Sequence, residues 1–310
     1  MATLTTESTT TPQGRRKPRR PYRGFAHTLW WFVLPAGALY IFAVLIPSVQ
    51  GGLFAFTDWD GVSLTKEWVG FDQFRRIFTD PYGATAIRNT LLIAVAVTIV
   101  QNLIGLLIAL GVNSKIKTRN ILRVVIFTPV VITSIAVGFL WQNLFSPAGG
   151  INQVLEAVGL GGLRQSWLGD PDVAIWSIII VVIWQFAGYS MVIFLAGLQG
   201  IPDEILEAAA IDGAGPIRRF WYVMRPMLAP AITINLMLSI IGGFKLFDQV
   251  LAMTKGGPGG ATNTISTLIY SNAFQLGNFG YGAALAVILT IFVAIASAIQ
   301  YRLLSKQEGN

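Results

Sequence analysis

Residues 90–112 read TLLIAVAVTIVQNLIGLLIALGV, a run of 23 residues without one charged side chain. A helix that crosses a bilayer needs about 20 mostly apolar residues at a rise of about 1.5 Å each. Five more long runs of mostly apolar residues occur along the chain, at 29–56, 121–145, 173–198, 227–253 and 281–304. We therefore predict an all-α integral membrane protein with six transmembrane helices.

The composition supports this class. Hydrophobic residues make up 54% of the 310 residues, charged residues only 12%, and the mean hydropathy is +0.61. A soluble domain carries about twice that share of charged residues. The chain has no cysteine and a single histidine, His27, so a disulfide framework, a thiolate metal site and a histidine metal cluster are all excluded.

The chain divides into three parts. Residues 1–24 begin Thr-rich, continue into the basic block RRKPRRPYR, and are predicted to form a disordered basic N-terminal tail. The apolar run that follows is too long for a signal peptide and has no cleavage site of the usual kind, so we expect it to stay as the first helix. Residues 25–305 form the six-helix domain, and residues 306–310 form a C-terminal tail.

Basic residues predict the orientation, because short cytoplasmic loops are enriched in lysine and arginine. One set of segments carries Arg15, Arg16, Lys17, Arg19, Arg20, Arg23, Lys115, Lys117, Arg119, Arg123, Arg218, Arg219, Arg225, Arg302 and Lys306. The opposite set carries fewer: Lys66, Arg75, Arg76, Arg88, Arg164 and Lys255. Both termini are therefore expected in the cytoplasm. Anionic lipid accounts for the net charge of +7, so no nucleic-acid partner is required.

The loop between the fourth and fifth runs has the sequence EILEAAAIDGAGPIRRFWYVMRPMLAP at residues 204–230. Asp203 and Glu204 directly follow Pro202, and proline with acidic residues is typical of the first turn of a helix. Gly213 and Gly215 predict a turn, after which Pro216 begins a second helix. In that second helix, one apolar and one polar face are expected. The apolar face is Ile217, Phe220, Trp221 and Met224, and the polar face is Arg218, Arg219, Tyr222 and Arg225. The second helix alone could be a simple lipid anchor. The first helix is rich in alanine, however, and its small side chains allow a groove of another protein to approach closely.

Three motifs resemble one family. The spacing of Glu207, Ala208, Ala209, Gly213, Val223 and Pro226 resembles the cytoplasmic EAA loop of permease subunits in binding-protein-dependent ABC importers. Two segments resemble carbohydrate permeases of the maltose and glycerol-phosphate type, LAGLQGIPDEILEAAAIDGA at 195–214 and FDQVLAMTKGGPGGATNT at 247–264. The resemblance covers about residues 25–305. One position differs, because the family usually has leucine where this chain has Arg225.

This resemblance implies a role for the loop at 200–226. Glu207 would pair with a basic residue of an ATPase subunit, Ala208 and Ala209 would pack into its groove, and Gly213 would make the turn, with Pro226 completing the motif. The implied partners are a second permease, which the first helix wraps, two ATPase subunits and an external sugar-binding protein. The implied location is the cytoplasmic membrane of a bacterium or archaeon.

The chain itself is predicted to be a transport subunit without enzymatic activity. It lacks a Gly-x-x-x-x-Gly-Lys-Ser/Thr phosphate loop, and in its most Gly-rich run, KGGPGG, Lys255 stands ahead of the glycines. ATP and Mg²⁺ would be bound by the partner ATPase subunits, and no cofactor is expected in this chain.

Polar residues inside apolar runs are candidates for the substrate pathway, because such groups are costly in lipid. They are Thr133, Ser134, Gln185, Tyr189, Ser239, Lys245 and Asp248. Each has a structural alternative: hydroxyls bond their own helix, Gln185 could join two helices, and Lys245 could pair with Asp248. The resemblance implies a sugar site at Ser134, Gln185, Phe186, Ser239, Gly243 and Leu246, to which Tyr189, Trp184 and Phe244 would add aromatic faces.

Other functions remain open at this stage. Permeases for glycerol phosphate share these motifs. A secondary transporter would need an ionisable centre near the bilayer midplane, for which only Lys245 and Asp248 are available. A membrane enzyme would need a catalytic constellation, which the sequence does not show.

Overall fold

The computed structural model describes residues 25–114 and 116–308, and the predicted tail at 1–24 lies outside them. The described residues are helical apart from turns and one isolated antiparallel bridge between Thr57 and Trp68. The chain divides into two units, residues 1–50 and 51–310. In the first unit, α1 (Phe25–Tyr40) continues through a π-helical turn (Ile41–Leu45) into α2 (Ile46–Phe54), which ends in the second unit. Residues Val33–Phe54 are long and apolar enough to span a membrane, as predicted.

Three uninterrupted helices of the second unit also satisfy the length and hydropathy of a membrane span. They are α4 (Pro81–Asn113), α8 (Pro171–Gln199) and the Phe279–Leu304 part of α15 (Phe279–Glu308). The two that start with proline have an aspartate cap. Asp80 accepts a hydrogen bond from the Tyr82 amide at 3.1 Å, and Asp170 accepts one from the Asp172 amide at 2.9 Å. Proline suits the first turn, where its missing amide has no helical acceptor.

The predicted third span at 121–145 is wrong as a single helix. Helix α5 (Arg119–Val131) and helix α6 (Ser134–Leu144) meet at 97°. Ile132 and Thr133 between them are extended. Pro129 lies in the last turn of α5, and a proline in a helix interior removes one backbone hydrogen bond.

The predicted fifth span at 227–253 is also interrupted. Helix α12 (Ala229–Phe244) ends before α13 (Asp248–Met253), and the segment Pro216–Met227 joins α12 at 73°. That segment consists of α10 (Pro216–Arg219), a π-helical turn (Phe220–Met224) and α11 (Arg225–Met227). Four helices can therefore span a membrane in the described chain, or six if each bent pair counts as one span.

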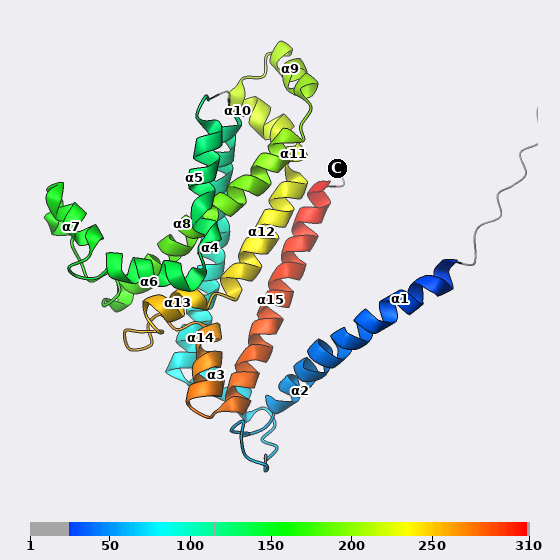
Figure 1. The fold of residues 1–310 in the computed structure, drawn as a ribbon, viewed down its shortest axis with the longest axis vertical. Helices are drawn as coiled ribbons and strands as arrows, with labels where there is room; N and C mark the ends of the chain where they lie inside the picture. Colours follow the sequence, from blue (N-terminus) through cyan, green and yellow to red (C-terminus); the bar gives the residue numbers. More distant parts are fainter. Residues whose placement is uncertain (1–24, 115, 309–310) are drawn as a thin grey trace, which may run out of the picture. The chain divides into compact units, whose positions relative to one another are not determined.

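Most of the remaining helices lie at the two ends of this second unit (Figure 1). Helix α9 (Asp203–Ile211) lies with α10 and α11 at the end where α15 also terminates. The opposite end holds α3 (Asp72–Thr79) and α14 (Ile265–Tyr270), which a π-helical turn (Ser271–Gln275) follows, and α6 and α13 lie between the two ends. Helix α7 (Gly150–Ala157) and the short 3-10 turn Gly161–Leu163 form a separate arm. Because α15 runs to Glu308, the predicted tail at 306–310 begins inside that helix.

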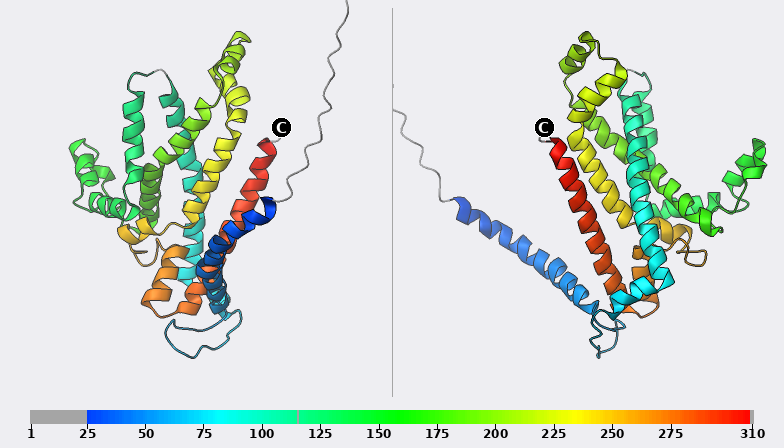
Figure 2. Two further views of the ribbon diagram at one scale, coloured as in Figure 1. Left: turned by 45° about the vertical axis from the view of Figure 1, so that its right-hand side comes forward. Right: turned by 180° about the vertical axis from the view of Figure 1, so that it is seen from behind.

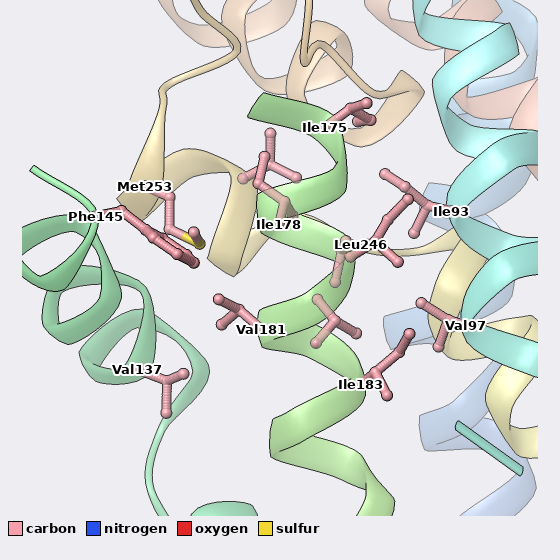
Figure 3. Close-up of a cluster of buried hydrophobic side chains, with 13 residues drawn as sticks. Ile93, Val97, Val137, Phe145, Ile175, Ile178, Val181, Ile183, Leu246 and Met253 are labelled. Atoms are coloured by element: carbon pink, nitrogen blue, oxygen red, sulfur yellow. The ribbon is translucent and has the colours of Figure 1, made fainter. Parts of the chain in front are cut away.

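Helices α4, α8 and α12 lie side by side in all views of Figures 1 and 2. One hydrophobic cluster joins α4 and α8 to α6 and to the segment that follows α12, through Val97, Val181, Val137 and Leu246 among others (Figure 3). Small residues allow the helices to approach closely. A Cβ added to Gly105 of α4 would lie 2.5 Å from the Ser190 Cβ of α8. Packing of small residues is the usual way in which membrane helices associate.

Candidate functional site

A cavity of about 620 Å³ opens between α4, α8 and α12 and the segment that connects α12 to α13. Six of the seven predicted pathway residues line it: Ser134, Phe186, Tyr189, Ser239, Gly243 and Leu246. They come from three stretches that are distant in sequence, namely the start of α6, the middle of α8, and the end of α12 with the segment that follows it. Hydroxyl groups together with two aromatic rings in a largely apolar wall are typical of small-molecule sites.

Gln185 is the predicted residue that does not line the cavity. It is buried, with 1% of its surface exposed, and its side-chain Nε2 donates to the Ile132 carbonyl at 3.0 Å. Its Oε1 accepts a hydrogen bond from Gln249 Nε2 at 2.9 Å. Ile132 directly follows the last residue of α5, at the point where the chain turns toward α6. Gln185 therefore links the break between α5 and α6 to α13. This is the structural alternative to a solute contact, in which the Gln185 amide joins two helices.

Lys245 and Asp248 both line the cavity, but they form no ion pair. Among the described residues, the only ion pair joins Arg164 Nη1 to Glu156 Oε2 at 2.8 Å. The pairing of these two residues on one helix, which was the structural alternative to a pathway role, does not form, because α12 ends at Phe244 and α13 begins at Asp248. In a continuous helix, residues three positions apart are neighbours on the helix surface. Lys245 and Asp248 do not have this relationship, because no continuous helix joins them.

Two successive glycines of α12 have different surroundings. Gly243 packs against α4, so that a Cβ at this position would lie 2.7 Å from the Ala94 Cα. A Cβ on Gly242 would meet no atom within 4 Å, although Gly242 also lines the cavity. Gly243 thus sets the distance between two helices, whereas Gly242 leaves open space beside the cavity.

Three polar side chains line the cavity that sequence reasoning did not select: Gln101, Asn235 and Gln249. All three are nearly fully buried. Gln101 lies inside the apolar run at 90–112. Because polar residues inside a membrane span are costly and tend to be functional, this position could have been selected from the sequence. Conversely, Thr133, Trp184 and Phe244 were considered and do not line the cavity. The Trp184 ring packs against Trp141, with centroids 5.3 Å apart.

The predicted coupling residues lie together on α9 and the turn that follows it. Glu207 and Ala208 are exposed, and Ala209 is half-buried at the edge of a groove of about 430 Å³ that Tyr222 and Arg218 also line. No bonded partner of the Glu207 carboxylate occurs among the described residues. Pro226 lies in α11, just before the bend into α12.

A Schellman turn ends α9. The Ala214 amide donates to the Ala209 carbonyl at 2.9 Å, and the Gly213 amide donates to the Ala210 carbonyl at 3.1 Å. Gly213 has a φ of +78°, the left-handed conformation that this turn requires and that glycine adopts without strain. The predicted turn at Gly213 is thus present.

The four residues of the expected apolar face differ in burial. Phe220 and Met224 are half-buried, but Ile217 and Trp221 are exposed. The Arg225 guanidinium lies over the exposed Trp221 ring, 5.3 Å from its centroid.

Comparison with known proteins gives consistent matches. The family model described as binding-protein-dependent transport system inner membrane component matches residues 101–308. The multiple sugar-binding transport system permease protein MsmF of Streptococcus mutans is 34% identical over 279 residues, which are 90% of this chain and 96% of the relative. The probable starch degradation products transport system permease protein AmyD of Thermoanaerobacterium thermosulfurigenes is 36% identical over 279 residues, 90% of this chain and 94% of the relative.

A solved structure shares the fold. It is a bacterial alginate ABC transporter in complex with an alginate pentasaccharide-bound periplasmic protein, and one of its chains superposes with a TM-score of 0.79. The match covers 91% of this chain and 95% of that chain at 22% sequence identity. The prediction from the loop motif is confirmed at the level of the family: the chain belongs to the inner membrane components of binding-protein-dependent transport systems.

Proposed function

We propose that this chain forms half of the translocation pathway of an ATP-driven importer for a carbohydrate, a sugar or oligosaccharide. Two observations support the substrate class. The cavity combines hydroxyl and amide side chains with the rings of Phe186 and Tyr189, which suits a ligand with many hydroxyl groups and apolar ring faces. Relatives that match nine-tenths of the chain carry sugar-transport names.

The observation that carries the proposal is a continuous connection between the exposed α9 and the cavity. Helix α9 passes through one tight turn into α10 and α11, and α11 joins α12, which supplies Ser239 and Gly243 to the cavity wall. A subunit that grips α9 would therefore move a wall of the cavity as a rigid body. We assign this grip to an ATPase subunit, with Glu207 paired to one of its basic residues and Ala208 and Ala209 against its surface.

The complete transporter would contain this chain, a second permease wrapped by the first helix, two ATPase subunits and an external sugar-binding protein. ATP and Mg²⁺ would be held by the ATPase subunits. Helices α9 to α11 and the end of α15 lie at one end of the second unit, which we assign to the cytoplasm of a bacterium or archaeon because of its arginines.

The test is a pair of acid substitutions on α9. Glu207→Ala removes the proposed contact, and Glu204→Ala removes a second exposed acid of the same helix as a matched control. Removing one partner of a charge pair that is buried on docking costs roughly 2–5 kcal/mol, because the other charge is left buried and unpaired. Glu207→Ala should therefore reduce co-purification of the ATPase subunits, or uncouple ATP hydrolysis from uptake, while Glu204→Ala should retain both.

The lipid-anchor alternative predicts a different result. Removing one acid from a basic loop would then leave both co-purification and coupled uptake intact. That outcome for Glu207→Ala would defeat the assignment of α9 to ATPase coupling.

A glycerol-phosphate-type solute is the second candidate, favoured by one observation. Lys245 lines the cavity without an ion-pair partner in the described part of the chain. An anionic solute would use this ammonium group, so Lys245→Gln should abolish uptake of glycerol 3-phosphate. A neutral sugar needs no such charge, and its uptake should change by less than about threefold, the effect of losing under one kcal/mol.

A further inference from the structure

The segment Pro216–Met227 carries an open groove of about 590 Å³. Five residues line it: Ile217, Arg218, Trp221, Tyr222 and Arg225. All five are exposed, with 77% of the surface of Ile217 and of Tyr222 and 53% of that of Trp221 accessible. The groove thus combines two guanidinium groups with an apolar and aromatic surface.

The other residues of this segment face the protein. Phe220, Val223 and Met224 are half-buried, and Met224 packs against the cluster of buried residues that includes Phe194 and Leu228. The segment is therefore held in place by one face, while the face with the groove is not covered by any part of the chain that the structure describes.

The two arginines of the groove have no anionic partner among the described residues. Neither forms an ion pair, and no acidic residue lines the groove. Asp212 lines the neighbouring groove together with Arg218, but these two side chains are not ion-paired either. The Arg225 guanidinium lies over the Trp221 ring, 5.3 Å from its centroid. This contact restrains the guanidinium and leaves its N–H groups available, and such groups bind phosphate through paired hydrogen bonds.

The groove lies where the chain enters a membrane helix. Arg225 is four residues before Ala229, the first residue of α12, which is apolar as far as Phe244. The helices α10 and α11 lie at the end of the second unit where α15 terminates (Figure 1). Tryptophan and tyrosine at the ends of membrane helices occupy the headgroup region, and arginine is enriched on the cytoplasmic side. The anion that this region supplies is the phosphate of acidic lipids.

We propose that the groove between Arg218 and Arg225 binds the phosphate headgroup of an anionic phospholipid, whose acyl chain lies against Ile217 and Trp221. Charge favours the lipid over an ATPase subunit as the occupant. The proposed ATPase contact, Glu207, requires a basic partner surface, whereas the groove requires a negative one. Only the assignment of this lipid to the cytoplasmic leaflet rests on the proposed function.

The experiment is native mass spectrometry of the complete transporter, released from detergent micelles after titration with dioleoyl phosphatidylglycerol or dioleoyl phosphatidylcholine. The difference in binding between the wild type and each variant isolates the lipid held at the groove. Arg225→Gln and Arg218→Gln each remove one guanidinium group from it. Arg219→Gln is the control, because Arg219 is an exposed arginine next to Arg218 in α10 that lines neither groove. All three variants make the same change in net charge.

Arg225→Gln and Arg218→Gln should each weaken the binding of one phosphatidylglycerol by about tenfold, the effect of losing a hydrogen bond to a charged group. Arg219→Gln should keep the wild-type affinity. Phosphatidylcholine has no net charge, and its binding should be the same in all four proteins.

Several results would overturn the inference. Equal losses in all three variants would show that the lipid responds to net charge and not to the groove. Release of the lipid by inorganic phosphate at the same concentration would assign the groove to a soluble phosphate compound.

Wild-type lipid binding by both Arg218→Gln and Arg225→Gln would also overturn it. Loss of the ATPase subunits from these two variants would then assign the groove to a carboxylate of the ATPase. A failure of carbohydrate uptake, which would defeat the proposed function, would change none of these binding results.

Discussion

Gly243 of α12 lies so close to Ala94 of α4 that a Cβ on the glycine would be 2.7 Å from the Ala94 Cα. Contacts this short between a Cβ and backbone do not occur, so any side chain at this position must push the two helices apart. The adjacent Gly242 has no atom within 4 Å of its would-be Cβ. The two glycines therefore make a matched pair for experiments.

Gly243→Ala is expected to destabilise the protein, because overpacking at a close helix contact costs roughly 1–3 kcal/mol. Gly242→Ala should leave stability unchanged. The midpoint of thermal unfolding of the purified protein in detergent measures the difference. Equal midpoints for the two variants would show that α4 and α12 separate without cost.

Gly242→Leu should fill part of the cavity without disturbing the helix contact. A leucine side chain occupies space that a solute of several sugar rings needs. Uptake of a trisaccharide should therefore fall more than uptake of a disaccharide, by about tenfold if the leucine removes roughly 1.4 kcal/mol of binding. Competitive uptake of maltotriose and maltose by the assembled transporter checks this. Unchanged selectivity would place the solute elsewhere.

Gln185→Leu should act on stability and not on solute binding. The change leaves the Ile132 carbonyl and the Gln249 amide without their bonds to Gln185, at a cost of about 1–3 kcal/mol for each buried group. The unfolding midpoint should fall by several degrees. Gln153→Leu is the control, because Gln153 is exposed and bonds only its own arm, donating to the Ala148 carbonyl at 2.8 Å.

The opposite pattern for Gln185→Leu, an unchanged midpoint with a raised KM, would restore Gln185 as a solute contact. This is the role that the family resemblance implies, and the geometry favours the structural alternative.

The sequence predicted the fold well where helices are straight. Runs such as 90–112 and 173–198 lie within α4 and α8. Hydropathy failed at 121–145 and 227–253 because it measures the polarity of a run and not its direction. The run at 227–253 breaks between Phe244 and Asp248, a stretch without proline. Pro129 was visible in the run at 121–145, but whether a proline bends a helix or is accommodated depends on which neighbours bond the freed backbone groups. Gln185, distant in sequence, donates to the Ile132 carbonyl at this break.

The site was predicted through hydroxyl, aromatic and glycine positions carried over from the family. That route could not find Asn235, whose hydrogen bond to the Ser190 carbonyl of α8 is visible only in the folded structure. Nor could it separate Gly242 from Gly243, because the difference is the distance to Ala94 on another helix.

Asp60 makes the loop that follows α2 sensitive to acid. Its carboxylate accepts hydrogen bonds from the Ser63 hydroxyl and from the amides of Ser63 and Val62, the latter two at 2.7 and 2.9 Å. These bonds, with the Ser63 hydroxyl first, lower the pKa of Asp60 from 3.8 to about 2. Because the folded pKa is depressed, the stabilisation is complete above the unfolded pKa and is lost as the pH falls toward 2.

Cleavage of this loop by pepsin should therefore increase as the pH is lowered from 3.8 to about 2. Asp60→Asn, which cannot carry the charge, should be cleaved readily across the whole range. Asp172→Asn, a change of an exposed aspartate at the start of α8, should behave like the wild type. Identical cleavage of wild type and Asp60→Asn at each pH would contradict the role of the charge.

Gly213 and Gly215 provide a final matched pair, in the turn that connects α9 to α10. Gly213 has a φ of +78° and Gly215 a φ of −63°, and neither would-be Cβ meets an atom within 4 Å. The two positions therefore differ in backbone conformation and not in space. A residue other than glycine at positive φ costs roughly 1–3 kcal/mol, whereas alanine at −63° costs nothing of this kind. Gly213→Ala should loosen the Schellman turn and weaken the link between ATP hydrolysis and uptake, so that more ATP is consumed for each solute molecule transported. Gly215→Ala should keep the wild-type ratio. If Gly213→Ala also keeps that ratio, the turn does not have to be rigid, and α9 cannot transmit force to α12 through it.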